Sequence, residues 1–145
     1  MPPPTAGPIG LEVAQTAKLI SRAFDDALAA VGGSLPIWLV LVSLKDQHHR
    51  AQRQLAEAVG IEGPTLTHHL NRMESAGLLT RTRDPRNRRV HLVELTESGT
   101  AMFDRLRETV VAFDHRLRGG ITEKEMSALR NVLGRLRSNI SVEEA

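Results

Sequence analysis

The sequence predicts a mainly helical protein with one small β-hairpin. Aromatic residues make up only 3% of the 145 residues. The core must therefore be built largely from Leu, Val, Ile and Ala, which favours helices. Apolar residues recur at intervals of three and four along most of the chain, as in amphipathic helices. Between residues 78 and 93, two short apolar runs flank a turn-like segment rich in arginine, which indicates a hairpin.

Composition excludes several classes of protein. The chain has no cysteine, so disulfides, thiol catalysis and cysteine-based metal sites are ruled out, and a cytoplasmic location is expected. No apolar run approaches the roughly 18 residues that cross a bilayer, so no membrane partner is expected. The first residues, MPPPTAGPIG, lack the regions of a signal peptide. Their prolines and glycines predict a disordered leader over residues 1–9, followed by a single domain over residues 10–145.

The first two helices are separated by a pair of glycines. Apolar or small residues recur with helical spacing over residues 11–31, and Gly32-Gly33 ends that helix. Ser34 is placed to cap the next helix, and Pro36 suits its first turn. The segment that follows, IWLVLVSLK, is apolar on most sides, so the second helix should be central and buried.

A short helix and a longer one follow, with a glycine between them. Residues 53–59 form the short helix, and Gly60 ends it. Pro64 opens the longer helix, which Gly77 closes. Apolar residues at helical spacing hold this longer helix to the core, namely Leu66, Leu70 and Met73. Two helices joined by a tight turn are the basis of a helix-turn-helix.

Two further helices complete the chain after the hairpin. The apolar runs of the hairpin lie at residues 78–80 and 90–93, and as a wing its strands are expected to include residues 80–83 and 89–94, with a tip at residues 84–88. Thr96 should cap the long helix that follows them. Thr122 and Glu125 form a capping box, in which each side chain satisfies the backbone of the other at the start of the last helix.

Positive charge is concentrated in the middle of the chain. The formal net charge is only +2, but residues 45–89 contain nine basic and five acidic residues. Five of these basic residues crowd the hairpin, namely Arg81, Arg83, Arg86, Arg88 and Arg89. A basic centre between slightly acidic flanks indicates a surface that faces a polyanion. A plain solvated surface would explain the charge alone equally well.

The segment over residues 53–96 has the order of a winged helix-turn-helix. In that motif the second helix presents a polar face to the major groove of DNA, and the hairpin forms a wing. The polar residues of the helix after Pro64 are Thr65, Thr67, His68, His69, Asn71 and Arg72. Thr and Asn side chains can hydrogen-bond base edges or phosphates. An arginine-rich wing tip suits the DNA backbone, with one arginine in a narrow minor groove.

The run RQLAEAVGIEGPTLTHHLNRMESAGLLTRTRDPRNRRVHLVELTESGTAMFDRL closely resembles transcriptional regulators of the MarR family, the multiple antibiotic resistance regulators. The most diagnostic parts are LAEAVGI, PTLTHHLNRMESAGLL, RDPRNRRV and LTESG, and the helix order over residues 10–141 matches as well. The resemblance implies a homodimeric DNA-binding regulator. Its winged helix-turn-helix lobe would span about residues 35–96, and its dimerisation helices about residues 10–31 and 97–141.

The resemblance also implies roles along the recognition helix. Thr65, Thr67 and His68 match the positions that face bases in the family. Relatives often carry arginine where this chain has His68, so the bidentate guanine contact of that arginine is lost here. Asn71 and Arg72 are expected to contact phosphates or to support the helix.

In the wing, the resemblance singles out three residues. Asp84 and Arg88 match the family's acidic and basic wing positions, and Arg86 matches the arginine that enters the minor groove. Which of the two arginines lies deeper stays open. Asp84 is expected to orient a guanidinium through a charge-assisted hydrogen bond. The other three arginines of the hairpin are Arg81, Arg83 and Arg89. Each of them could contact a phosphate or only keep the surface soluble, and Arg83 is included among the expected DNA-binding residues of the wing.

Six histidines raise the question of a metal site. His48 and His49 lie near Asp46, and with His115 they could supply nitrogen and oxygen ligands. An adjacent pair cannot easily face one site, however, and no His-x-x-x-His spacing occurs. No metal and no cofactor are therefore expected. His69, like the histidine before it, is interpreted as facing DNA.

Dimerisation and ligand binding are the remaining implications. The apolar stripes of the first and last helices suit pairing with a second chain, with packing inside one chain as the alternative. The residues expected in that pairing are Leu11, Ala14, Leu129, Leu133, Leu136 and Ile140. A small-molecule effector, commonly an anionic aromatic compound, would bind between the dimer helices and the DNA-binding lobe. Its expected lining, which could equally be plain core, is Phe24, Trp38, Leu41, Phe113 and His115.

Together these features predict a sequence-specific regulator that binds double-stranded DNA. A homodimer would repress transcription at a pseudo-palindromic promoter site, and a small molecule would release it. A ligand-independent architectural DNA-binding protein is the alternative, distinguished by a ratio of specific to non-specific affinity near one. An enzyme is not expected, because the chain has no Ser-His-Asp order, glycine-rich phosphate loop or metal-ligand cluster.

Overall fold

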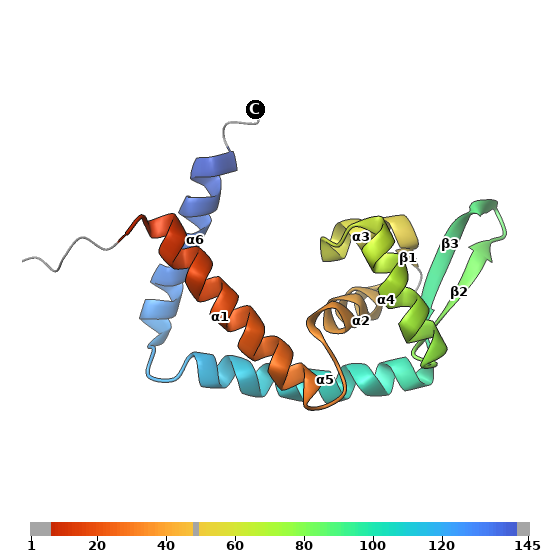
Figure 1. Cartoon of the computed structure of the whole chain (residues 1–145), viewed down its shortest axis with the longest axis horizontal. Helices are drawn as coiled ribbons and strands as arrows, with labels where there is room; N and C mark the ends of the chain where they lie inside the picture. The colour runs from red at the N-terminus through yellow and green to blue at the C-terminus, as the bar shows by residue number, and fades with distance from the viewer. Residues whose placement is uncertain (1–6, 48–49, 142–145) are drawn as a thin grey trace, which may run out of the picture. The chain divides into compact units, whose positions relative to one another are not determined.

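Helices make up most of the structure, a computed structural model that describes residues 7–47 and 50–141. The predicted fold class, mainly helical with a hairpin wing, is confirmed. Two compact units divide at Val111 and Ala112, inside α5, and each is described by itself. The elements are α1 (Ile9–Ala29), α2 (Leu35–Asp46), β1 (Arg50–Ala51), α3 (Gln52–Val59), α4 (Gly63–Ser75), β2 (Leu79–Asp84), β3 (Asn87–Leu95), α5 (Glu97–Leu117) and α6 (Glu123–Ser141) (Figure 1).

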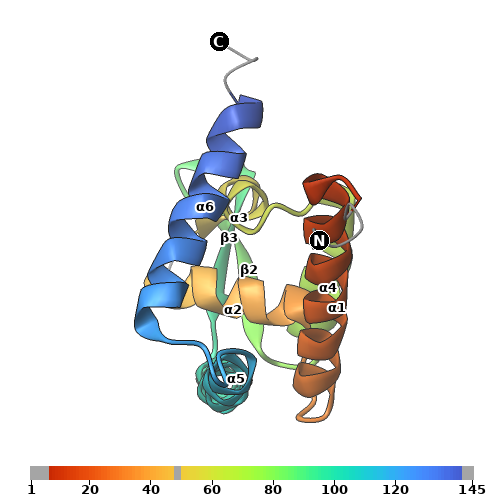
Figure 2. The same ribbon diagram turned by 90° about the vertical axis from the view of Figure 1, so that its left-hand side faces the viewer.

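The first unit encloses a core of aliphatic side chains around α2. Within this unit, α2 lies between α3 and the N-terminal half of α5 (Figures 1 and 2). Val40, Leu41 and Leu44 are fully buried, as the apolar segment IWLVLVSLK predicted. Trp38 stacks on Phe103 of α5, with ring centroids 5.3 Å apart. The same core receives Leu28, Leu55, Leu66, Leu70, Met73, Leu79, Val93, Met102 and Leu106 from the surrounding elements.

Caps and a left-handed glycine set the helix boundaries that matter for the lobe. The Ser34 hydroxyl accepts a hydrogen bond from the Ile37 backbone N–H at 3.2 Å, which confirms the predicted cap of α2. Gly60 ends α3 with φ of +70°, a conformation that favours glycine. α4 then begins at Gly63, one residue before the predicted Pro64. The two helices and this turn are the predicted helix-turn-helix.

Within the described residues, the sheet has three antiparallel strands in the order β1-β3-β2. β2 and β3 form the predicted hairpin, but both extend further toward its tip than the apolar runs indicated. Beyond Thr80 and before Val90 the strand residues are polar and mostly exposed. The alternating pattern therefore fades there, while backbone pairing continues. β1 was not predicted, since two residues carry no pattern; it pairs through Arg50 opposite Val93.

The base of the hairpin is locked to the start of α5. Thr96 Oγ1 accepts a hydrogen bond from the Gly99 N–H at 3.0 Å, the predicted cap, and donates to the Gly77 carbonyl at 2.5 Å. The Thr96 N–H donates to the Leu78 carbonyl at 3.1 Å. A Cβ on Gly99 would lie 2.0 Å from that same Leu78 oxygen, so only glycine fits. The segment LTESG thus fixes where the wing leaves the lobe.

α1 buries little of its surface within the first unit. It begins at Ile9, inside the predicted leader, whose first six residues lie outside the described ones. Leu28 near its end is fully buried, and Phe24 packs partly against the core. Most of its other large apolar side chains are exposed, Leu11 by 56% and Leu19 by 68%.

The second unit contains the last turns of α5 and the helix α6. The predicted capping box is present: Thr122 Oγ1 accepts from the Glu125 N–H at 3.1 Å, and Glu125 Oε1 accepts from the Thr122 N–H at 3.0 Å. Hydrogen bonds from the Thr122 backbone and hydroxyl hold the pKa of Glu125 below its ordinary value. No residue of α6, described over its whole length, is buried, and Ile140 is 76% exposed.

Candidate nucleic-acid interface

The helix α4 turns one face to the core and the opposite face outward. Leu66 and Met73 are buried on the inner face, and helical periodicity places His68 about half a turn away from them. His68 is exposed, and so are Thr65 and Arg72 on one flank of the outward face. These three predicted recognition residues are accessible to a partner.

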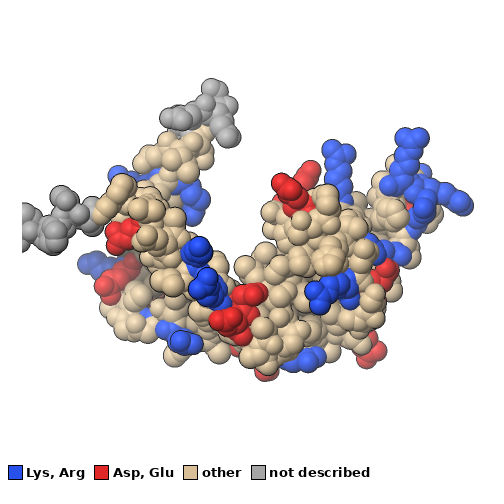
Figure 3. All heavy atoms as spheres, in the orientation of Figure 1, with Lys and Arg blue, Asp and Glu red and all other residues tan. Residues whose placement is uncertain are grey.

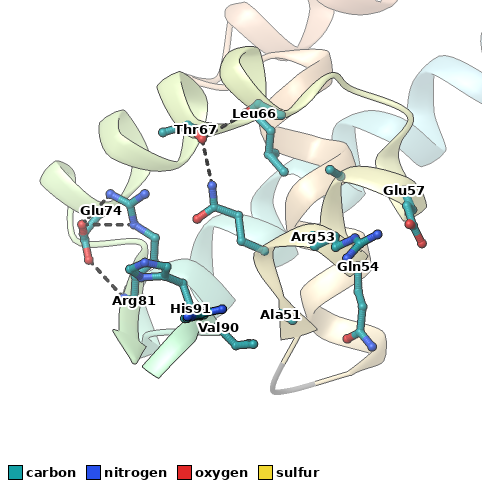
Figure 4. Close-up of a pocket in the computed structure, with 14 residues that line it drawn as sticks. Ala51, Arg53, Gln54, Glu57, Leu66, Thr67, Glu74, Arg81, Val90 and His91 are labelled. Carbon is teal, nitrogen blue, oxygen red and sulfur yellow. Dashed lines mark hydrogen bonds and ion pairs between the residues drawn. The ribbon is translucent and has the colours of Figure 1, made fainter. Parts of the chain in front are cut away.

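The flank of α4 that faces the wing is occupied by contacts within the protein. Thr67 donates its hydroxyl hydrogen to the Gly63 carbonyl at 3.0 Å and accepts a hydrogen bond from the Gln52 side chain at 2.8 Å (Figure 4). A hydroxyl has one hydrogen to donate, so in this arrangement Thr67 cannot donate to a base. The structure gives Thr67 a different task from the predicted base contact, because it joins α4 to α3.

Asn71 and Glu74, on the same flank, both bind Arg81 of β2. Arg81 Nη2 and Nε donate to Glu74 Oε1 at 2.9 and 3.3 Å, and the Arg81 backbone N–H donates to Oε2 at 3.0 Å (Figure 4). Arg81 Nη2 also donates to the Asn71 amide oxygen. The hydrogen-bonded guanidinium keeps the pKa of Glu74 below its ordinary value of 4.5. Glu74 was missed at the sequence level, and Asn71 acts here as a support.

Short polar side chains organise the turn at the wing tip. Asp84 Oδ1 accepts a hydrogen bond from the Arg86 backbone N–H at 2.9 Å. Asn87 Oδ1 accepts one from the Arg89 backbone N–H at 3.2 Å. Both are Asx-type contacts, in which a side chain two residues earlier holds the chain in a turn. This corrects the expectation for Asp84, because its carboxylate orients the backbone of the turn and not a guanidinium.

Positive side chains gather over the β2–β3 hairpin, as Figure 3 shows. Arg86, Arg88 and Arg89 are exposed. Arg83 is exposed as well, and its Nη1 donates to the Arg88 carbonyl across the hairpin at 3.5 Å. Because Asp84 and Asn87 hold the turn, the guanidinium groups of these arginines are not needed for it and face solvent. Such a cationic tip attracts a polyanion.

A groove of about 1160 Å³ lies between α3, α4 and the sheet. Arg53 and Gln54 of α3 line it on one side, and Arg81 and His91 of the sheet line it on the other (Figure 4). Sequence reasoning included neither Arg53 nor Gln54 nor His91 in the site. Arg53 could have been found, since it is a basic residue at the start of the first helix of the motif.

A second cavity, of about 700 Å³, lies beside the other flank of α4. His69 and Arg72 line it, so two predicted recognition residues border a hollow as well as the surface. The rest of the lining includes the apolar side chains of Ile37, Met73 and Met102 and the carboxylate of Asp25, which accepts a hydrogen bond from the Leu35 N–H at 2.9 Å. Arg72 beside these apolar side chains is suited to a small molecule with one acidic group.

The five residues predicted to line an effector pocket border neither of these two hollows. Leu41 has no exposed surface and belongs to the core. Trp38 is stacked on a phenylalanine of α5, and Phe24 is partly buried against the core. Phe113 and His115 belong to the second unit, where Phe113 is buried and His115 is exposed.

The described residues were also expected to hold neither a metal site nor a membrane span. Within residues 7–47 and 50–141, no group of three or more His, Asp or Glu side chains could hold a metal ion. His48 and His49, the adjacent pair weighed as ligands, lie outside that range. No helix in the same part of the chain combines the length and hydropathy needed to cross a bilayer.

Known structures share this fold over nearly its whole length. A MarR-family transcriptional regulator from Rhodococcus sp. RHA1 is 27% identical, with a TM-score of 0.77 over 88% of this chain and 91% of that one. The transcriptional repressor CouR, solved with a 23-mer DNA duplex, is 26% identical, with a TM-score of 0.83 over 94% and 99%. BpsR of Bordetella bronchiseptica, whose DNA binding is regulated by 6-hydroxynicotinic acid, is 21% identical, with a TM-score of 0.82 over 94% and 98%.

The family assignment rests on the sequence of the lobe as well as on its shape. Residues 34–91 match the model of the MarR family. They run from the cap of α2 into β3 and so include the helix-turn-helix and most of the wing. An outward-facing recognition helix and an arginine-tipped hairpin lie within the matched residues. Over residues 34–91 the chain matches the MarR family of transcriptional regulators, and over nearly its whole length it is similar in fold to a solved MarR-family regulator.

Proposed function

We propose that the protein is a homodimeric, sequence-specific repressor that binds a pseudo-palindromic promoter site and is released by a small acidic molecule. One observation supports the proposal most strongly. The polar face of α4 and the arginine-rich wing tip are exposed, and the hydrophobic core of the lobe is filled by other side chains. A helix with an outward polar face can enter the major groove, and a cationic hairpin can follow the backbone into the minor groove.

The accessible residues of α4 divide the work of DNA recognition. His68 points away from the core and is the best placed to meet base edges, with Thr65 beside it. Arg72 lies further along the helix and suits a phosphate. In the wing, Arg86 and Arg88 are the candidates for the minor groove, and Arg83 and Arg89 for the backbone.

Exposed apolar surface supports the homodimer. α6 has no buried residue, and α1 exposes large apolar side chains such as Leu11 and Leu19. Helices that carry such stripes are stable in water when another apolar surface covers them. A second copy is the partner that two-fold DNA sites require, since symmetry then presents two copies of α4 about 34–36 Å apart.

The cavity beside α4 supports release by a small molecule. An acid bound there would pair with Arg72 and could hydrogen-bond His69, and both residues also belong to the proposed DNA surface. DNA and the ligand would then compete for the same two side chains, which links the two binding events. BpsR, which shares the fold, is regulated by 6-hydroxynicotinic acid, and a small aromatic acid is therefore the class to test first.

The salt dependence of DNA binding tests the wing assignment. Arg86→Ala should weaken binding to every duplex and lower the slope of log K against log[salt] by about 0.9 per protomer, because one guanidinium in the groove no longer displaces counterions from the DNA. Fluorescence anisotropy with labelled duplexes between about 50 and 200 mM salt measures both quantities. Arg130→Ala on α6 is the matched control, since it removes an exposed arginine outside the lobe.

An unchanged affinity and slope for Arg86→Ala would remove the wing from the interface. The same titrations with a specific and a scrambled duplex separate this function from an architectural one. A repressor binds its site about a thousandfold or more tighter than scrambled DNA, whereas a ratio near one favours the architectural alternative.

A further inference from the structure

We propose that Glu74 and Arg81 are positioning residues that couple the recognition helix to the wing, so that α4 and the β2–β3 hairpin meet DNA as one rigid body. The proposal rests on the proposed function, because DNA is the ligand that both elements would meet. It removes Arg81 from the phosphate contacts and gives the wing-facing flank of α4 a mechanical task.

We call the Glu74–Arg81 pair the lock, because its hydrogen bonds hold α4 and β2 in a fixed relation. The Glu74 carboxylate of α4 accepts three hydrogen bonds from one residue of β2, two from the Arg81 side chain and one from its backbone. The backbone contact fixes the position of the strand, and the side-chain contacts fix its rotation about the helix. A carboxylate gripped at both oxygens is oriented far more tightly than a simple ion pair.

Arg81 differs from the other arginines of the hairpin in how little of its side chain is accessible to DNA. Its side chain is only 17% exposed, and its charge lies 2.9 Å from a carboxylate oxygen. Its Nη2 group also donates to Asn71, one turn before Glu74 on α4. Arg86, Arg88 and their neighbours at the tip are exposed. A neutralised, half-buried guanidinium contributes little to a phosphate contact.

The lock lies at the last point where β2 packs against the lobe. Leu79 is buried and Arg81 is half-buried, but Thr82 and Arg83 beyond them are exposed. The backbone between α4 and β2 contains only a few residues and includes Gly77 in a left-handed conformation. Without the side-chain contacts, β2 is held to the lobe only through its base and through β3, which pairs with β1 at Leu92 and Val93, so the outer hairpin gains freedom to tilt against α4.

Substituting Glu74 separates positioning from electrostatics. Glu74→Gln raises the net charge of each protomer by one, so electrostatics alone predicts tighter DNA binding. Loss of positioning predicts the opposite for a specific duplex. We expect roughly tenfold weaker binding to the selected duplex, with unchanged or tighter binding to a scrambled one. Glu57→Gln on α3 is the matched control, because it changes the charge beside the same groove without touching the lock.

Arg81→Gln completes the test. A positioning residue gives a reduced ratio of specific to non-specific affinity and an unchanged salt slope, and in the double variant with Glu74→Gln the losses do not add. Equal weakening on both duplexes, with a slope lower by about 0.9 per protomer, would mean that Arg81 contacts a phosphate and would overturn the proposal. Thermal unfolding of each variant confirms that the lobe is folded.

A measurement on the free protein tests the Glu74–Arg81 lock separately from the proposed DNA-binding function. Residual dipolar couplings of backbone amides report the orientations of α4 and of residues 79–95 in the free protein. In the wild type both should fit one alignment frame, and in Glu74→Gln the hairpin couplings should shrink. Unchanged couplings would overturn the lock whatever the DNA data show. A wild-type protein without preference for any duplex would instead overturn the proposed function.

Discussion

The winged-helix lobe buries its apolar side chains within one chain, whereas α6 leaves its own exposed. Leu41, Leu55, Leu70 and Val93 come from four different elements of the lobe and have no exposed surface. α6 carries a comparable apolar stripe, yet every one of its residues remains accessible. The lobe therefore closes its own core, while α6 has the exposed apolar surface on which the proposed homodimer rests.

The largest effect is expected where the lobe closes its core. Leu70→Ala removes a fully buried side chain of α4 and should lower the free energy of unfolding by about 2–5 kcal/mol. Urea denaturation measures the loss, which should not depend on protein concentration below the dimer dissociation constant. Leu129→Ala on α6 serves as the control for an exposed leucine. A loss below about 1 kcal/mol for Leu70→Ala would contradict the closed core.

The next largest effect is expected on dimerisation, when the exposed apolar stripe of α6 is changed. Leu129→Asp places a charge on its apolar stripe and should raise the dimer dissociation constant by about a hundredfold, as loss of an interface hot spot does. Sedimentation velocity should give a dimer for the wild type at micromolar concentration and a monomer for the variant. Asn131→Asp, which adds the same charge two residues along, should stay dimeric. A wild-type monomer that still binds DNA tightly would break the comparison.

Within the lobe, the outward face of α4 should differ from its occupied flank. His68→Ala should change the base preference at symmetric positions of the site, by about 1–3 kcal/mol of discrimination at each. Thr67→Val keeps the shape but removes the hydrogen bond from Gln52 of α3 and the one to the Gly63 carbonyl within α4, and should leave the preference at those positions intact. Selection of bound duplexes compares the two variants. An unchanged profile for His68→Ala would exclude it from base reading.

The smallest effect is the pH dependence of the lock. Because Arg81 holds the pKa of Glu74 below 4.5, the carboxylate stabilises the folded lobe above that pH. The contribution is lost as the pH falls through the lowered folded-state value. The free energy of unfolding of Glu74→Gln should therefore lie slightly below that of the wild type near neutral pH and converge with it in acid. Solvent screening of partly exposed side chains keeps the difference small.

Urea denaturation over a series of pH values measures this convergence. The same comparison in an Arg81→Gln background is the control, since the cause of the lowered pKa is then absent. A difference between wild type and Glu74→Gln that persists unchanged at the lowest pH would show that the charge of Glu74 does not matter.

Much of the fold followed from local patterns along the chain. Ser34, Thr96 and Thr122 predicted three helix starts, because a short side chain with an oxygen is the residue type that caps a helix N-terminus. The inner face of α4 followed from spacing alone. The outer strands of the wing were expected up to residues 83 and 89, but their last residues toward the tip, Asp84, Asn87 and Arg88, were assigned to the turn, because polar residues that pair through the backbone leave no alternation in the sequence.

The site was harder to predict than the fold. That α4 and the wing carry it followed from order and charge, but the tasks of single residues did not. Gln52 and Thr67 are fifteen positions apart, and nothing in either residue type indicates that they bind each other. Arg81 looks like its neighbours in the sequence, and only the position of Glu74 opposite it distinguishes a held arginine from a free one.

Selection of bound sites from a pool of random duplexes tests whether the protein is a symmetric repressor that reads DNA. We expect an enriched motif with two-fold symmetry, whose half-sites are centred about 10–10.5 base pairs apart. A dimerisation variant such as Leu129→Asp should lose the symmetric motif. Absence of enrichment, or a single asymmetric site bound equally well by that variant, would contradict a symmetric repressor that reads DNA through α4 and the wing.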